Sequence, residues 1–91
     1  MARFRISYTD EARRALHSMP GNYRGRARRV LESLAIEPYP STAKELRSMP
    51  GYFRYRLDGW RIVYRVDEGA GNLLILAIRQ KKGPETYQDL E

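Results

Sequence analysis

The sequence contains no cysteine and only one histidine, His17, in 91 residues. The first absence excludes a disulfide framework and any thiolate metal site. A single imidazole does not provide the histidine pair that acid–base chemistry often uses. His17 also falls outside the apolar stripe of its predicted helix, which indicates a surface residue. We therefore expect neither a metal nor another cofactor.

Long apolar runs are also missing. The longest one, residues 73–78, is far too short to cross a membrane. Residues 1–8 alternate like a strand and lack the apolar core of a secretory signal. These features predict a cytoplasmic protein, and the chain length predicts one domain over residues 1–91.

Positive charge dominates the composition. Lys and Arg number 17 against 11 Asp and Glu, which gives a net charge of +6. Lysine occurs only at positions 44, 81 and 82, so most of the excess is arginine. Arginine is preferred where a planar, bidentate contact with phosphate is needed. The charge predicts a polyanionic partner and says nothing about a reaction.

Residues 52–65 are typical of a β-hairpin. Two alternating runs flank Asp58-Gly59, the strongest short signal for a two-residue turn. This turn would pair Leu57 with Trp60, Arg56 with Arg61, Tyr55 with Ile62, Arg54 with Val63, and Tyr52 with Arg65. Alternation then predicts an apolar core face made of Phe53, Tyr55, Leu57, Trp60, Ile62 and Tyr64.

The opposite face of the hairpin is strongly basic. It carries Tyr52, Arg54, Arg56, Arg61, Val63 and Arg65. Like charges directly across a strand pair destabilise a sheet, so Arg56 opposite Arg61 costs folding free energy. We interpret the four arginines as an anion site. The alternative is a solvated face whose charges oppose aggregation.

The remaining pattern predicts an α+β fold. A strand at residues 3–8 precedes two helices, Asp10–Met19 capped by Thr9, and a second one capped by Asn22 and ending near Glu37. The four arginines of the second helix are either solvated or a second phosphate-contacting surface; they are Arg24, Arg26, Arg28 and Arg29.

The second half predicts strands. A short strand at residues 43–47 and a turn at residues 49–51 precede the hairpin, and another turn spans residues 67–72. The last strand, residues 73–78, continues to Arg79, which shares the parity of Leu73, Ile75 and Ala77. A short helix then begins at Gly83-Pro84. The antiparallel helix pair should cover one face of a mostly antiparallel sheet.

The segment Lys44–Asp67 resembles the RelE/ParE superfamily of type II toxins. The resemblance extends over essentially the full chain. The similarity lies in Leu46-Arg47, Pro50-Gly51, the basic strand, the Gly59–Tyr64 string GWRIVY and the terminal string IRQKKGPETY. It implies the RelE-like microbial ribonuclease fold. RelE-like members cut mRNA in the ribosomal A site, whereas ParE-like members inhibit DNA gyrase without catalysis.

The resemblance to the RelE branch implies a set of site residues. Catalytic roles would fall to Arg54, Arg56, Arg61, Lys81 and Tyr87, and contacts with RNA, including ribosomal RNA, to Lys44, Arg47, Arg65, Arg79 and Lys82. Arginine stands at positions 54 and 56 where RelE has lysine, and lysine stands at position 81 where RelE has arginine. These exchanges keep the charge but change the donor geometry. Tyr87 would act as the base, and Lys81, or Arg79 or Lys82 in its place, as the acid.

The resemblance also implies partners. Expected partners are a cognate antitoxin, the ribosome with its 16S rRNA and A-site mRNA, and operator DNA reached through the antitoxin. The tyrosine-bearing segment after the last strand favours the RelE branch over the ParE branch. A plain RNA-binding module is a third reading, which the inward-facing aromatics of the hairpin disfavour.

Overall fold

The computed structural model describes residues 3–80, which form two helices and five strands. In chain order they are β1 (Arg5–Tyr8), α1 (Asp10–Ser18), α2 (Gly21–Ile36), β2 (Ala43–Leu46), β3 (Met49–Leu57), β4 (Trp60–Asp67) and β5 (Asn72–Gln80). Each was predicted within a few residues, and the predicted helix from Gly83 lies outside the described residues. Neither α1 nor α2 is long and apolar enough to cross a membrane.

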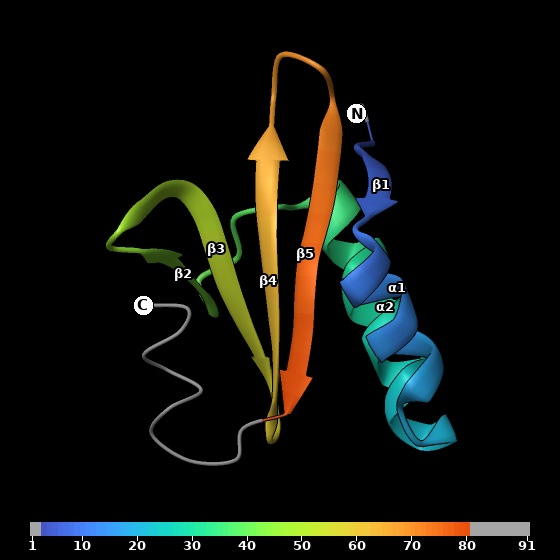
Figure 1. Ribbon diagram of the computed structural model, residues 1–91. Helices are drawn as coiled ribbons and strands as arrows, with labels where there is room; N and C mark the ends of the chain where they lie inside the picture. The colour runs from blue at the N-terminus through green and yellow to red at the C-terminus, as the bar shows by residue number, and fades with distance from the viewer. Residues whose placement is uncertain (1–2, 81–91) are drawn as a thin grey trace.

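The strands form one sheet in the order β1-β5-β4-β3-β2. The pair β1–β5 is parallel and the other three pairs are antiparallel, so the predicted mostly antiparallel α+β fold is confirmed. Figure 1 shows α1 and α2 beside the β1 and β5 end of the sheet, with β2 at the opposite end. β1, the first strand of the chain, therefore pairs with β5, the last strand of the described residues.

The hairpin has the predicted register. All five predicted pairings occur, from Leu57–Trp60 at the turn to Tyr52–Arg65. Asp58 adopts a left-handed backbone with φ of +53°, a conformation that Asp tolerates better than most residues. The Asp58 carboxylate also accepts a hydrogen bond from Arg26 Nη1 of α2 at 2.7 Å. The turn is therefore tied to the helix layer.

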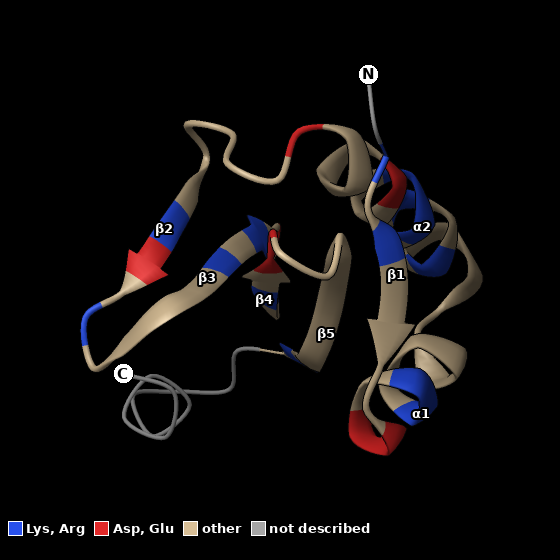
Figure 2. Cartoon of the chain, turned by 90° about the horizontal axis from the view of Figure 1, so that it is seen from above, with Lys and Arg blue, Asp and Glu red and all other residues tan. Residues whose placement is uncertain are grey.

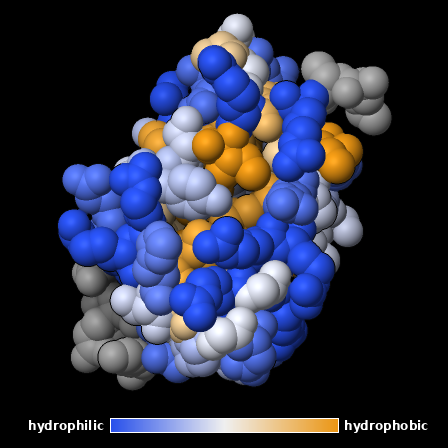
Figure 3. Space-filling view, turned by 90° about the vertical axis from the view of Figure 1, so that its right-hand side faces the viewer, coloured by the Kyte–Doolittle hydropathy of each residue, from blue (hydrophilic) through white to orange (hydrophobic). Residues whose placement is uncertain are grey.

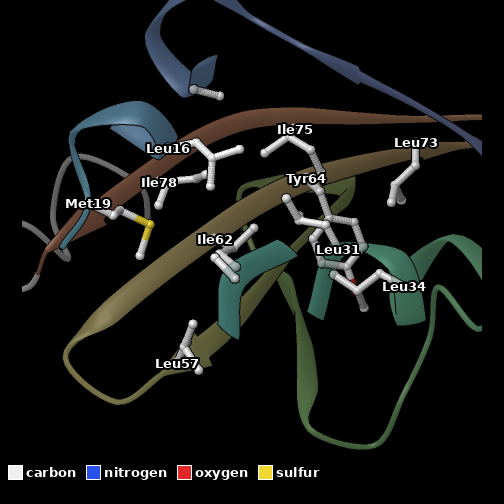
Figure 4. Close-up of a cluster of buried hydrophobic side chains, with 12 residues drawn as sticks. Leu16, Met19, Leu31, Leu34, Leu57, Ile62, Tyr64, Leu73, Ile75 and Ile78 are labelled. Atoms are coloured by element: carbon white, nitrogen blue, oxygen red, sulfur yellow. The ribbon is translucent and has the colours of Figure 1, made fainter. Parts of the chain in front are cut away.

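The core lies between the helices and one face of the sheet (Figure 4). Leu31 and Leu34 of α2 lie near Tyr64 of β4, which is fully buried. The Tyr64 hydroxyl donates a hydrogen bond to the carbonyl of Pro38 at 2.8 Å, so the polar end of this buried ring is satisfied. All six residues of the predicted core face belong to or pack on this cluster, namely Phe53, Tyr55, Leu57, Trp60, Ile62 and Tyr64.

The predicted N-cap of α2 is wrong. Asn22 lies inside the helix, which begins at Gly21 after Pro20. The Pro20 carbonyl already accepts a hydrogen bond from the Arg24 amide at 2.8 Å, and this bond starts the first helical turn ahead of Asn22. At α1 the prediction is confirmed, since Thr9 Oγ1 accepts a hydrogen bond from the Ala12 amide.

The predicted turn at residues 49–51 is also wrong. The turn occupies residues 47 and 48, and β3 already begins at Met49. The pairing register shifts between Glu45 and Leu46, and Gly51 has a φ of +88°. Proline and glycine mark a bulge at the edge of the sheet here, a position where a strand tolerates both residues.

We expect Leu31→Ala to lower the free energy of unfolding by about 2–5 kcal/mol, because Leu31 is 1% exposed and its loss leaves a cavity. Ile36→Ala on the same helix is the control, since Ile36 is 52% exposed. It should change stability by less than about 0.5 kcal/mol. Equal effects in urea unfolding would contradict the placement of the core.

Stability should fall at alkaline pH because of Tyr39. Its hydroxyl donates a hydrogen bond to Glu68, and burial together with the Glu68 carboxylate raises the Tyr39 pKa to about 12. Since the unfolded pKa is about 10, this stabilisation is complete below pH ~10 and is lost as pH rises towards ~12.

Urea unfolding across this pH range measures the effect. Tyr39→Phe should show a shallower decline than the wild type. Some decline should persist, because burial also raises the pKa of Tyr64. Identical pH profiles for the two proteins would refute the assignment to Tyr39.

Candidate nucleic-acid interface

A basic hollow of about 280 Å³ lies over β2 and β3. Its lining consists of Thr42, Lys44, Arg54 and Arg56. Lys44 stands directly across the strand pair from Arg54, and Arg56 follows on the same face of β3. Three cationic side chains predicted from the sequence are therefore brought together around one space. Figure 2 shows the basic residues of β2 and β3 on this side of the molecule.

A row of three arginines crosses the sheet beside this hollow. Arg56 of β3 pairs with Arg61 of β4, which pairs with Arg79 of β5. Arg56 is exposed, whereas Arg61 is only 3% exposed and lies between its two neighbours. Desolvation of a cation costs free energy, but it also strengthens the field that the cation exerts nearby. The charge of Arg61 therefore lies beneath the surface, between Arg56 and Arg79.

The position of Arg79 corrects the predicted parity of β5. Leu73 and Ile75 belong to the main core, whereas Ala77 packs in a different cluster on the other face. The register between β4 and β5 shifts where Tyr64 pairs with Ile75 and Val63 with Ala77. The extra residue, Leu76, is a bulge that reverses the alternation. It brings Arg79 to the same face as Arg61.

Thr9 fixes this bulge to the start of α1. Its hydroxyl donates to the carbonyl of Leu76 at 2.6 Å, and its amide donates to the carbonyl of Ile75 at 3.1 Å. Two residues later, Glu11 accepts a hydrogen bond from Arg79 Nε at 2.9 Å. The α1 terminus therefore sets the bulge and holds one member of the arginine row.

The other predicted site residues are dispersed. Arg65 is exposed and its guanidinium lies 6.0 Å from the ring centroid of Tyr52. Arg47 is exposed in the turn between β2 and β3. The remaining predicted residues, Lys81, Lys82 and Tyr87, lie outside the described part of the chain.

Two groups of residues at this face were not predicted. Thr42 and Glu11 had no distinctive signal, because a threonine in a loop and an acid in a first helical turn are both common. The second group is an apolar cluster of Leu46, Val63 and Ala77 on the arginine face. The only available signal was that Val63 interrupts the basic alternation.

The arrangement suits a phosphate-bearing polymer. Guanidinium groups offer paired donors to phosphate, and the open hollow continues into the arginine row. Within residues 3–80, no three His, Asp or Glu side chains gather in a manner that could hold a metal ion. What this face offers a ligand is therefore positive charge and directed N–H donors.

Comparison with protein families gives one match. Residues 6–83 match the family model described as the ParE toxin of the type II toxin-antitoxin system, parDE. No curated protein sequence matches the chain.

Solved structures share the fold. The RelBE2 toxin–antitoxin complex from Mycobacterium tuberculosis contains a chain with 27% identity and a TM-score of 0.75; the match covers 88% of this chain and 100% of that one. The isolated E. coli RelE toxin has 20% identity and a TM-score of 0.79, with 97% and 94% covered. The RelE–RelB complex from Pyrococcus horikoshii has 22% identity and a TM-score of 0.76, with 91% and 100% covered.

Glu11→Gln should raise the affinity for a single-stranded oligonucleotide, because it removes a negative charge 2.9 Å from the Arg79 guanidinium. Stability should change by less than about 1 kcal/mol, since both side chains are at least one-third exposed. Fluorescence anisotropy measures the binding and urea unfolding the stability.

The matched control is Glu37→Gln, which makes the same exchange after the end of α2. Glu37 is exposed and is not part of the lining of the basic hollow. The same gain in affinity for both variants would show that only net charge matters.

Proposed function

Because the chain belongs to the ParE toxin family of type II toxin–antitoxin systems, within the RelE/ParE superfamily, we propose that it is a ribosome-dependent endoribonuclease of the RelE kind. It cleaves mRNA in the ribosomal A site and so inhibits translation in the cytoplasm. The observation that carries this proposal is the basic hollow of Lys44, Arg54 and Arg56 beside the arginine row.

RNA carries its own nucleophile, the 2′-hydroxyl. In the proposed reaction this oxygen bonds to the adjacent phosphorus while the bond from phosphorus to the 5′-oxygen breaks. The products are a 2′,3′-cyclic phosphate and a 5′-hydroxyl. The reaction needs a base for the 2′-hydroxyl proton, cations for the charge at phosphorus and an acid for the 5′-oxygen.

The basic residues supply the charge stabilisation in this mechanism. Arg54 and Arg56 bind the phosphodiester from the open side, and Arg61 stabilises the charge at phosphorus from below. Loss of one such donor typically costs about 3 kcal/mol of barrier. Arg79, held by Glu11, positions the flanking RNA and is second to Lys81 as the acid.

The proposed base is Tyr87. A free phenol has a pKa near 10 and is a weak base at neutral pH. Cations around the phenol favour its ionised form, and the lining of the hollow offers three of them. Tyr87 takes the 2′-hydroxyl proton and Lys81 donates one to the leaving oxygen. Neither step requires a metal ion.

A second candidate is the non-enzymatic inhibition of DNA gyrase. It is favoured by the family model, which is that of ParE toxins. In this case the helix pair would provide the contact surface, and neither Arg56 nor Tyr87 would carry a chemical role.

The proposed partner is an antitoxin. Several of the similar solved structures are RelB–RelE complexes. A disordered acidic segment of the antitoxin folds over Arg54, Arg56 and Arg61 and neutralises them. Operator DNA is then contacted through the antitoxin, and the free toxin contacts 16S rRNA through Arg47, Arg65 and Lys82.

Arg56→Ala and Tyr87→Phe should each reduce mRNA cleavage on translating ribosomes by at least 100-fold, which is about 2.7 kcal/mol of barrier. Arg56 is exposed, so the folded state should be retained. Primer extension maps the cuts and measures their rates. The control is Arg14→Ala, which removes one exposed arginine from α1.

Full cleavage by both variants would exclude this mechanism. A gyrase supercoiling assay with the wild type separates the two candidates. Gyrase inhibition that persists in both variants, without any mRNA cleavage, would establish the ParE-type function.

A further inference from the structure

A second concentration of positive charge lies on the helix pair. Residues 10–36 contain six arginines and three carboxylates, and no lysine. The arginines are Arg13 and Arg14 on α1 and Arg24, Arg26, Arg28 and Arg29 on α2. Figure 2 shows the basic residues of α1 and α2 on the β1 side of the molecule, across from β2. Figure 3 views this side, where hydrophilic side chains surround a smaller hydrophobic area.

One hollow on this side is lined by residues from three elements. It has a volume of about 180 Å³ and is lined by Tyr8 of β1, Arg13, Leu16 and His17 of α1, and Arg28 of α2. Leu16 is buried and forms an apolar floor, whereas Arg13, His17 and Arg28 are exposed at the rim.

The walls of this helix-side hollow are held in place. Arg24 Nη1 of α2 donates a hydrogen bond to the carbonyl of His17 at 3.2 Å, which joins the end of α1 to α2. β1 is fixed by its parallel pairing with β5, in which Tyr8 stands opposite Ile75. The backbone segments that carry the donors are therefore in place before any ligand arrives, which lowers the entropic cost of binding.

The Tyr8 hydroxyl lies within the field of these charges. Burial raises the pKa of Tyr8, and this outweighs Arg28 and Arg13, which act to lower it; Glu32 adds to the increase. The phenol therefore keeps its proton at neutral pH and can donate a hydrogen bond. The hollow thus offers a neutral O–H donor in addition to two guanidinium groups.

The size of the hollow limits the ligand. At ~30 Å³ per water molecule it holds about six waters, and it is smaller than typical pockets for drug-sized molecules. It fits a single anionic group, with the rest of the ligand outside.

The composition of the lining favours an RNA backbone over a protein. Protein interfaces depend on apolar and aromatic anchors at their centre. Here the one aliphatic side chain is already buried, so the hollow offers mainly charge and hydrogen-bond donors. By contrast, a hollow of about 330 Å³ between α2 and β3 combines Arg26, Arg29 and Ser33 with the larger apolar surfaces of Val30, Tyr55 and Leu57.

We propose that the helix-side hollow binds one phosphodiester group of an RNA backbone through Arg13, Arg28 and Tyr8. This site lies apart from the basic hollow of β2 and β3 and has no part in cleavage. It gives the protein a second point of attachment, so that an RNA chain or a folded RNA can contact both sides of the molecule.

The test is a pair of matched double variants. Arg13→Ala/Arg28→Ala removes both rim arginines, and Arg14→Ala/Arg29→Ala removes the next residue on each helix with the same loss of charge. Anisotropy with fluorescent single-stranded 2′-O-methyl RNA at a series of KCl concentrations measures binding. This RNA lacks the nucleophile of the proposed cleavage, so the result does not depend on enzymatic activity.

The rim variant should bind severalfold more weakly, with a salt slope about 0.7 units shallower because one phosphate contact is lost. The control variant should keep the wild-type slope. Equal losses of RNA affinity in both variants would overturn the proposal, because RNA would then respond only to the overall positive charge of the helix pair. Urea unfolding verifies that both variants are folded.

A competition arm with poly-glutamate tests the class of ligand. It should displace RNA only weakly, and its affinity should not depend on Arg13 and Arg28. If poly-glutamate binds as tightly as RNA and loses affinity in the rim variant, the site is one for an acidic protein and the proposal fails.

Discussion

The candidate site depends on one extra residue in β5. The Leu76 bulge reverses the alternation of the strand, so that Ile75 faces the core while Arg79 lies on the arginine face. A regular strand would have directed Arg79 towards the core, where an arginine is costly. Thr9 donates hydrogen bonds to the carbonyls of Ile75 and Leu76, and these bonds hold the bulge in place. A backbone feature thus decides which charges meet.

The arginine row opposes the stability of the sheet. Like charges across neighbouring strands repel each other, and Arg61 is buried among them. Glu11 offsets part of this repulsion at Arg79. Burial of the large core on the opposite face of the sheet compensates for the rest of the unfavourable free energy. Such local conflict with folding rules is expected where a site is selected for function.

The sequence was sufficient for local features. The hairpin register followed from Asp58-Gly59 and the core face from alternation, because both rules act between neighbouring residues. The hollow of Lys44, Arg54 and Arg56 follows from the same register together with the pairing of β2. The three cations were predicted as separate site residues, and their meeting depends on the pairing of β2 with β3, which the sequence did not indicate.

The predictions that failed, and the contacts that were not predicted, concern non-local or irregular features of the structure. A bulge has no period, so the run Leu73–Ile78 concealed the change of face at Leu76. The pairing of Glu11 with Arg79 joins residues 68 positions apart, and no local pattern encodes it. Thr42 became part of the hollow only through the position of the loop before β2. Hydrophobic periodicity therefore gives no indication of the roles of these residues.

The parallel pairing of β1 with β5 has a consequence for synthesis of the protein. Ser7 and Asn72 are hydrogen-bonded although they are 65 positions apart, so the sheet cannot close while β5 is still inside the ribosomal exit tunnel. Such distant pairings also form slowly. A nascent chain therefore lacks the completed arginine row until β5 has left the tunnel and paired with β4. The topology itself delays maturation of the polypeptide, which leaves the producing cell an interval in which to sequester it.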